Sequence, residues 1–102
     1  MIRHIVLTKF KDDVSEETIK GIYDGLSAVA DKLPGAANFT GGRSQSPEQI
    51  ERGYMHGFVI DFHSWDALQT YADNEDHKAL GGQLVTNAQG GIDGILVLDL
   101  DV

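Results

Sequence analysis

The sequence predicts a single α+β domain whose elements follow one another in the order βαββαβ. Three observations predict this class. The chain of 102 residues has the size of one domain. Three segments alternate with the two-residue period of a strand, and two repeat apolar residues with the period of a helix. Hydrophobic residues make up 41% of the chain, enough for one buried core but not two, so we expect one domain over residues 1–102.

The first expected element is a strand over residues 2–10. One face of this strand carries Ile2, His4, Val6, Thr8 and Phe10, and the other carries Arg3, Ile5, Leu7 and Lys9. Because apolar residues occupy both faces, we expect a central strand that is covered on both sides.

A long helix should follow this strand. Ser15 is a typical N-cap, and Glu16 and Glu17 place acidic groups in the first turn, where the helix dipole favours them. Apolar residues then recur at spacings of three and four over four turns, at Ile19, Ile22, Tyr23, Leu26, Val29, Ala30 and Leu33. Pro34-Gly35 is expected to end the helix.

Two further strands are expected in the middle of the chain. Residues 36–42 form a weaker strand pattern around Phe39, and the loop after it places Pro47 where a helical turn could start. Residues 54–62 return to strict alternation, with Tyr54, His56, Phe58, Ile60 and Phe62 on one face.

The last third of the chain predicts a helix and a final strand. Ser64 is a good N-cap for a helix whose buried stripe is Trp65, Leu68, Tyr71 and Ala72. We expect a short further helical piece over residues 77–84, with His77 just beyond the preceding helix, and then a strand over residues 95–102.

This order of elements is the ferredoxin-like arrangement, with a four-stranded antiparallel or mixed sheet and both helices on one face. We expect the first and third strands to lie side by side and parallel at the centre. The uncovered face would then expose Ile5, Leu7, Met55, Val59, Ile95 and Val97. Monomers rarely expose such a patch, so the pattern predicts a homodimer with two sheets face to face.

Composition excludes several functions. The net charge of −8 and only eight Lys and Arg residues argue against nucleic acid as a partner. The chain has no cysteine, which excludes disulfides and thiolate chemistry. No apolar run approaches the ~20 residues of a membrane span, so we expect no membrane partner and a cytoplasmic location.

Several motifs in this order resemble the stress-responsive dimeric α/β-barrel family. The motifs are residues 4–11, Leu33-Pro34-Gly35, Gly42-Arg43, Ser46-Pro47-Glu48, residues 53–57, Tyr71, His77 and Asp99. The resemblance covers essentially the whole chain and implies a homodimer whose two sheets form a barrel. The family includes plant stress proteins and a plant polyketide cyclase that performs an aldol condensation.

The resemblance to the cyclase implies roles for individual residues. His77 would be the general base, Tyr71 would hold or polarise a carbonyl group, and His4 and His56 would line the pocket. Many relatives carry His-Pro where this chain has Asn74-Glu75, so the loop before His77 differs chemically.

The alternation of the strands independently places His4 and His56 on one face. We expect both to lie close together under the helices and to converge with Tyr71 and His77 on one cavity. Tyr23 and Phe58 would also line this cavity, which would hold a small apolar or carbonyl ligand. The competing interpretation makes His4 and His56 structural histidines and Tyr71 an ordinary core aromatic residue. His4, His56 and His77 lack the short spacing of a zinc site, and we expect no metal or cofactor.

Three functions remain open at this level. The first is a dimeric, stress-associated binding protein of unassigned activity. The second is a cofactor-independent lyase or isomerase resembling a polyketide cyclase, which uses His77 and Tyr71. The third is a cofactor-free monooxygenase, which rests on analogy between folds alone.

Overall fold

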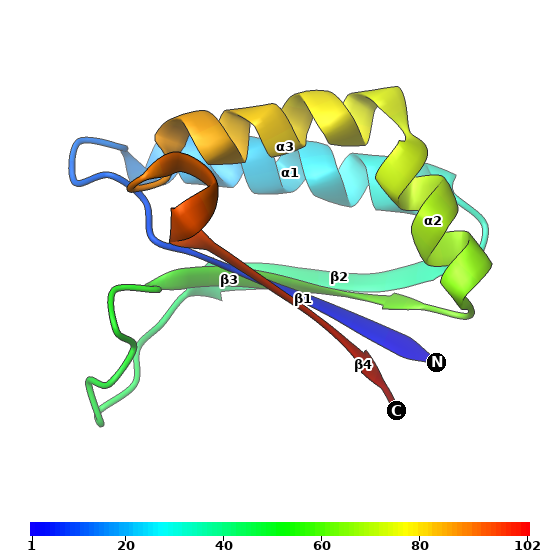
Figure 1. The fold of residues 1–102 in the computed structure, drawn as a ribbon, viewed down its shortest axis with the longest axis horizontal. Helices are drawn as coiled ribbons and strands as arrows, with labels where there is room; N and C mark the ends of the chain where they lie inside the picture. Colours follow the sequence, from blue (N-terminus) through cyan, green and yellow to red (C-terminus); the bar gives the residue numbers. More distant parts are fainter.

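The chain folds into one four-stranded sheet with all its helices on one face (Figure 1). The structure is a computed structural model that describes residues 1–102. Its elements are β1 (Ile2–Thr8), α1 (Glu16–Lys32), β2 (Ala36–Arg43), β3 (His56–Phe62), α2 (Trp65–Asp73), α3 (Glu75–Asn87), the short 3-10 helix η1 (Gly91–Gly94) and β4 (Ile95–Asp101). This confirms the predicted ferredoxin-like class. None of the helices is both long and apolar enough to cross a membrane.

The strands lie in the order β2-β3-β1-β4, and every neighbouring pair is antiparallel. The prediction of parallel first and third strands is therefore wrong. The crossover through α1 makes β1 and β2 run in the same direction, and β3 turns back from β2 and inserts between them. A strand that returns from β2 must run against β1.

The helix starts follow the predicted caps. The Ser15 hydroxyl accepts a hydrogen bond from the backbone N–H of Thr18 at 3.1 Å, and Ser64 caps α2 in the same way from Ala67 at 3.2 Å. The third helix is longer than the predicted residues 77–84, because α3 begins at Glu75 and places His77 in its first turn. Residues 47–50 form no helical turn.

The core lies between the sheet and the helices. The predicted inner faces of the first and third strands are confirmed, since alternate residues of β1 and β3 are buried there. Both strands are shorter than predicted: β1 ends at Thr8, and β3 begins at His56. Phe10 lies beyond β1 but stays buried and pairs with Ala88.

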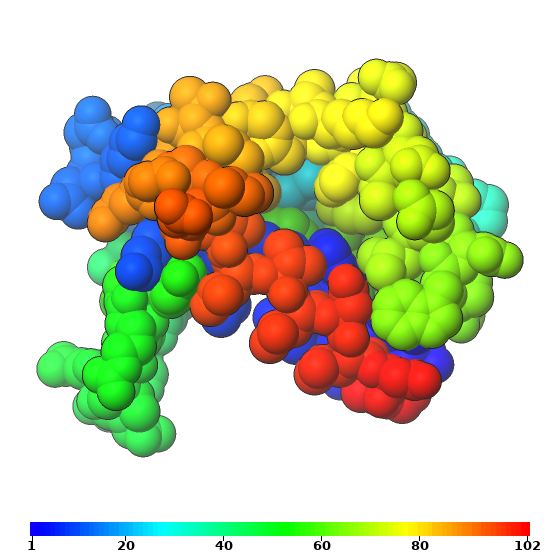
Figure 2. Space-filling model, in the orientation of Figure 1, coloured from blue at the N-terminus to red at the C-terminus, as the bar shows by residue number.

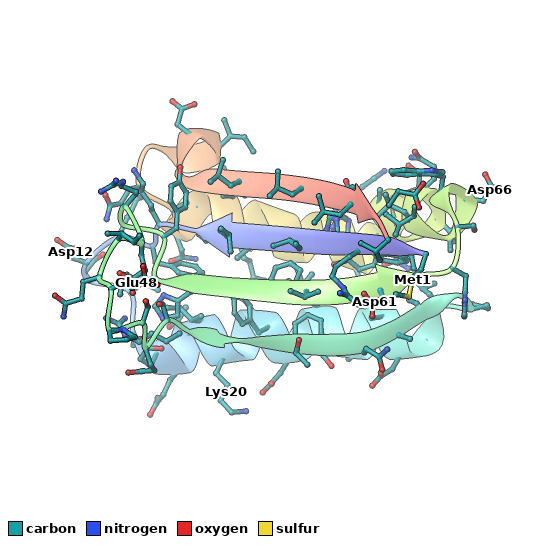
Figure 3. All side chains as sticks on the ribbon, turned by 90° about the horizontal axis from the view of Figure 1, so that it is seen from below. Met1, Asp12, Lys20, Glu48, Asp61 and Asp66 are labelled. Atoms are coloured by element: carbon teal, nitrogen blue, oxygen red, sulfur yellow. The ribbon has the colours of Figure 1, made fainter.

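The opposite face of the sheet carries no helix (Figure 3). Register places Leu96 opposite Leu7 and Leu98 opposite Ile5, and directly paired residues share a face. The open face therefore carries Ile5, Leu7, Val59, Leu96, Leu98 and Leu100. The prediction that Ile95 and Val97 lie on this face is wrong. Both sides of β4 carry apolar residues, so only the pairing of β4 with β1 decides which of them face the helices.

Candidate functional site

Three of the predicted site residues come together beneath the helices. His4 lies on the inner face of β1, Tyr71 near the end of α2, and His77 in the first turn of α3. The ring centres of Tyr71 and His77 are 4.2 Å apart, and those of His4 and Tyr71 are 5.8 Å apart. We call these three residues, with Asp99, the His4–His77 cluster.

The junction between α2 and α3 positions His77. Asn74 ends α2 and caps α3, and its side-chain oxygen accepts a hydrogen bond from the backbone N–H of His77 at 3.0 Å. Residues 74–76 thus supply an Asn N-cap followed by acidic Glu75 and Asp76 in the first turn of α3. This local geometry gives His77 a defined backbone position.

Hydrogen bonding sets the tautomer of the His77 ring. The nearest partner of Nδ1 is the Ala72 carbonyl oxygen at 3.2 Å, and a carbonyl oxygen only accepts, so Nδ1 carries the proton. In the neutral ring, Nε2 is then an unprotonated acceptor. Burial lowers the pKa of His77 below its usual value, the Ala72 bond opposes this shift, and the charge of His4 adds to it. The arrangement favours a neutral imidazole near pH 7.

Tyr71 supplies a donor beside this acceptor. Its side chain is 1% exposed, and its hydroxyl is buried without a hydrogen-bond partner. Burial raises the pKa of Tyr71, so the phenol stays protonated. An unpaired buried hydroxyl is destabilising, and a bound acceptor would relieve that cost.

Asp99 holds the remaining histidine of the cluster. Its carboxylate accepts a hydrogen bond from Nδ1 of His4 at 2.6 Å, and register places the two residues directly opposite each other. In the sequence analysis, Asp99 appeared only as part of the family resemblance and had no assigned role. The apolar residues on both sides of β4 concealed which face Asp99 occupies.

The cluster lies beside an opening between α3 and β4. Figure 2 shows the surface hollowed there, between the yellow and orange atoms of α3 and the red atoms of β4, with deeper atoms of α1 and β3 visible. None of the three long helices packs mainly against β4, since α1 packs on β2 and α3, α2 packs on α3 and β3, and α3 packs also on η1. Val97 therefore stays 51% exposed although it shares the inner face with Val6. We call this opening the β4 cleft.

The prediction that His4 and His56 lie close together is wrong. His4 pairs with Ile60 and His56 with Thr8, so the two histidines occupy positions four residues apart along β1, about 13 Å. The antiparallel direction of β3 causes this separation. The three histidines do not converge on one cavity, and a ligand-lining role for His56 stays a prediction.

His56 belongs to a second polar cluster at the other end of the sheet. Its Nε2 lies 2.9 Å and 3.0 Å from the two carboxylate oxygens of Glu16, and Arg43 donates to the same carboxylate at 3.2 Å. The hydrogen bond between His56 and Glu16 is the main cause that lowers the pKa of the Glu16 carboxyl group. We call these three residues, with Tyr23, the His56–Glu16 cluster.

Of the remaining predicted residues, Tyr23 belongs to this second cluster and Phe58 packs against it. Their ring centres are 5.2 Å apart, and both residues are buried. A groove of about 460 Å³ runs between α1 and the edge strand β2, past Tyr23, Phe39 and His56. At its floor, Nε2 of His56 is already bonded to the Glu16 carboxylate, and the other ring nitrogen, Nδ1, is buried and does not open onto the groove. No group of three His, Cys, Asp or Glu side chains anywhere in residues 1–102 is arranged to hold a metal ion.

The fold and the cluster define a small ferredoxin-like domain with a polar site between sheet and helices. The family sequence model of the stress-responsive A/B barrel domain matches residues 2–102. The chain therefore belongs to that family. It is 30% identical over 98 residues to the stress-response A/B barrel domain-containing protein HS1 of Arabidopsis thaliana, covering 96% of this chain and 86% of that protein.

Two further proteins are similar over most of the chain. Olivetolic acid cyclase of Cannabis sativa is 22% identical over 80 residues, which cover 78% of this chain and 79% of the cyclase. The crystal structure of a dimeric ferredoxin-like protein of unknown function from Jannaschia has a TM-score of 0.92 at 34% identity. That match covers 99% of this chain and 98% of the Jannaschia chain.

Proposed function

We propose that the chain catalyses proton transfer next to the carbonyl group of a small compound. The single observation that carries this proposal is that a hydrogen-bond acceptor and a hydrogen-bond donor, neither with a partner in the protein, lie on adjacent side chains. Nε2 of His77 is an acceptor without a protein partner, and the hydroxyl of Tyr71 is an unpaired donor whose ring lies against the His77 ring. A base beside a hydrogen-bond donor is what enolisation requires.

The steps follow from this geometry. Nε2 of His77 takes the proton from the carbon next to the carbonyl, and the electrons of that C–H bond move onto the carbonyl oxygen. The Tyr71 hydroxyl donates a hydrogen bond to that oxygen as negative charge develops on it. The protonated His77 then returns its proton to carbon or oxygen. Formation or cleavage of a carbon–carbon bond at the enolate would give a cyclase or a lyase.

Access to Tyr71 requires motion in the cleft. Solvent does not reach the hydroxyl in this structure, so a carbonyl group meets it only when side chains at the floor of the cleft separate. The relation to a protein named as a cyclase supports this proposal over the monooxygenase. The alternative is a protein that binds its ligand in the β4 cleft without reacting with it, which the position of Val97 also favours.

Deuterium exchange tests the proposal without knowledge of the natural substrate. Acetophenone in D₂O exchanges its methyl protons by enolisation, and proton NMR measures the rate. We expect the protein to accelerate this exchange, and Tyr71→Phe and His77→Ala each to lower the acceleration about 100-fold. His63→Ala, at an exposed histidine, is the matched control and should leave the rate unchanged.

Two results would contradict the catalytic proposal. Equal exchange in the wild type and both variants would mean that neither side chain takes part. Exchange no faster than in buffer, while acetophenone shifts the His77 ring signals, would establish the binding protein instead.

We also propose that two copies pair through the open faces of their sheets. Leu98, in the middle of the edge strand β4 on that face, is 50% exposed, and the Jannaschia protein with the same fold is dimeric. Sedimentation should give twice the chain mass of 11.1 kDa at micromolar concentration. Leu98→Arg should give monomers, whereas Trp65→Arg, at an exposed apolar residue of α2, should not. A wild-type monomer would overturn the pairing.

A further inference from the structure

One wall of the β4 cleft is a side of α3 that carries a glycine, Gly81, between His77 and Val85. Leu80 of α3 lies against Gly25 of α1, so that side of the helix turns away from β4. Val85 lies against Gly91, just before β4, so its side of the helix turns toward the cleft. Gly81 is one turn before Val85 and one turn after His77, and residues four apart share a helix face. Gly81 therefore lies next to His77 on the cleft side.

Space is open above Gly81. A Cβ atom placed there would meet no heavy atom within 4 Å, although the residue is partly buried. Its neighbour Gly82 has equally open space but is exposed, about a quarter of a turn further round the helix. Glycine in a helix interior is destabilising relative to alanine, so the helix gains nothing from either residue by itself.

The charges around the cleft limit what can enter it. Asp99 faces the cleft from β4 and is held by His4. The only Lys or Arg on α3 is Lys78, which is exposed and lies 3.7 Å from Glu75 of its own helix. The His4–His77 cluster contains no Lys or Arg that could balance a second negative charge near Asp99, so a carboxylate or phosphate would be repelled there.

We propose that Gly81 determines which compounds the β4 cleft admits, and that these are uncharged carbonyl compounds whose apolar body lies over Gly81. This inference rests on the proposed function, since it takes the carbonyl end to lie at Tyr71 and His77. The apolar body extends along α3 toward Val85 and Val97. A side chain at position 81 would fill that space.

Paired glycine substitutions test this role. Gly81→Leu fills the gap beside His77, and Gly82→Leu adds the same side chain to the outer surface. Both variants should unfold at or above the wild-type temperature, because leucine favours the helix. Titration with acetophenone, followed by the NMR signals of the His77 ring, should give wild-type affinity for Gly82→Leu and at least tenfold weaker affinity for Gly81→Leu. Gly81→Ala, with one methyl group, should fall between them.

A charged probe of the same shape tests the ligand class. The anion 4-acetylbenzoate should bind the wild type at least tenfold more weakly than acetophenone does. Equal binding of the two probes would overturn the uncharged class, and unchanged acetophenone affinity in both Gly81 variants would overturn the role of Gly81. Either result leaves the exchange assay with Tyr71→Phe standing as a separate test of catalysis. A wild type whose His77 signals respond to neither probe would overturn the site itself.

Discussion

Two histidine–carboxylate pairs lie on the inner face of the same sheet, yet their surroundings differ. His4 is bonded to Asp99 of the edge strand β4, and His56 is bonded to Glu16 at the start of α1. Each imidazole is buried on a central strand and gives one nitrogen to a carboxylate. The pairs therefore share their local chemistry, and the elements around them make the difference.

The His4 pair has neighbours that can react. Tyr71 and His77 add an unpaired donor and an unprotonated nitrogen, and the β4 cleft opens beside them. The His56 pair is closed by α1 on one side, and Arg43 shares the Glu16 carboxylate. Its own spare nitrogen, Nδ1, is buried without a partner.

This difference shows why a histidine–carboxylate pair alone does not indicate a catalytic site. The Glu16 bond fastens the first turn of α1 to β3, which is a structural task. The Asp99 bond joins two strands that the sheet already holds together, so it adds little to the fold. We therefore assign the His56–Glu16 cluster to stability and the His4–His77 cluster to the proposed chemistry.

The largest expected effect that tests this comparison is on stability. His56→Ala removes a side chain that is 6% exposed and contacts Phe10, and it should lower the free energy of unfolding by about 2–4 kcal/mol. His63→Ala, at an exposed position, should change it by less than about 0.5 kcal/mol. Urea titration measures both values. A cost for His56→Ala no larger than that for His63→Ala would remove the structural role.

The next effect is on rate. Asp99→Asn should slow the acetophenone exchange roughly tenfold, because an amide holds the His4 ring less firmly than a carboxylate does, and that ring lies 5.8 Å from the ring of Tyr71, the proposed donor. Glu16→Gln should leave that rate within about twofold, because its cluster lies about 13 Å away.

A second readout shows whether Asp99 acts through His4. The nitrogen chemical shifts of the His4 ring should change in Asp99→Asn and stay constant in Glu16→Gln. If Glu16→Gln slows the exchange as much as Asp99→Asn, the two clusters cannot be assigned separate tasks.

Local sequence signals carried most of the fold prediction. Ser15 and Ser64 start helices because their hydroxyl groups satisfy free backbone N–H groups, which is visible in a few adjacent residues. The burial of alternate residues in β1 follows from its period of two in the same way. The class of the fold follows from these signals and their order.

Relations between distant segments could not be predicted in this way. The register of β3 against β1 depends on the strand direction and separates His56 from His4. Both faces of β4 carry apolar residues, so which of its residues face the helices depends on its pairing with β1. That pairing places Asp99 opposite His4. Tyr71 and His77 were predicted together because they are six residues apart in sequence, and Asn74 joins their helices directly.

The smallest expected effects are on the pH dependence of stability, where the two clusters should act in separate windows. Burial lowers the pKa of His77 below 6.5 in the folded state, so the unfolded chain binds the proton first as pH falls. The contribution of His77 to the free energy of unfolding is therefore complete above pH 6.5, and it is lost as the pH falls toward and through the pKa of His77 in the folded state. The bond to His56 lowers the pKa of Glu16 below 4.5, so its contribution is complete above pH 4.5 and is lost at more acidic pH.

Urea titrations from pH 3 to pH 8 separate these windows. His77→Asn should flatten the stability curve below pH 6.5 and leave the acidic limb unchanged. Glu16→Gln should flatten only the limb below pH 4.5, since the glutamine does not titrate. The proposed base also has to be neutral to act, so the exchange rate should rise with pH through the folded pKa of His77 and reach its plateau by pH 6.5. A rate that falls over that range, or a His77→Asn curve that matches the wild type below pH 6.5, would show that His77 does not titrate as its buried position requires.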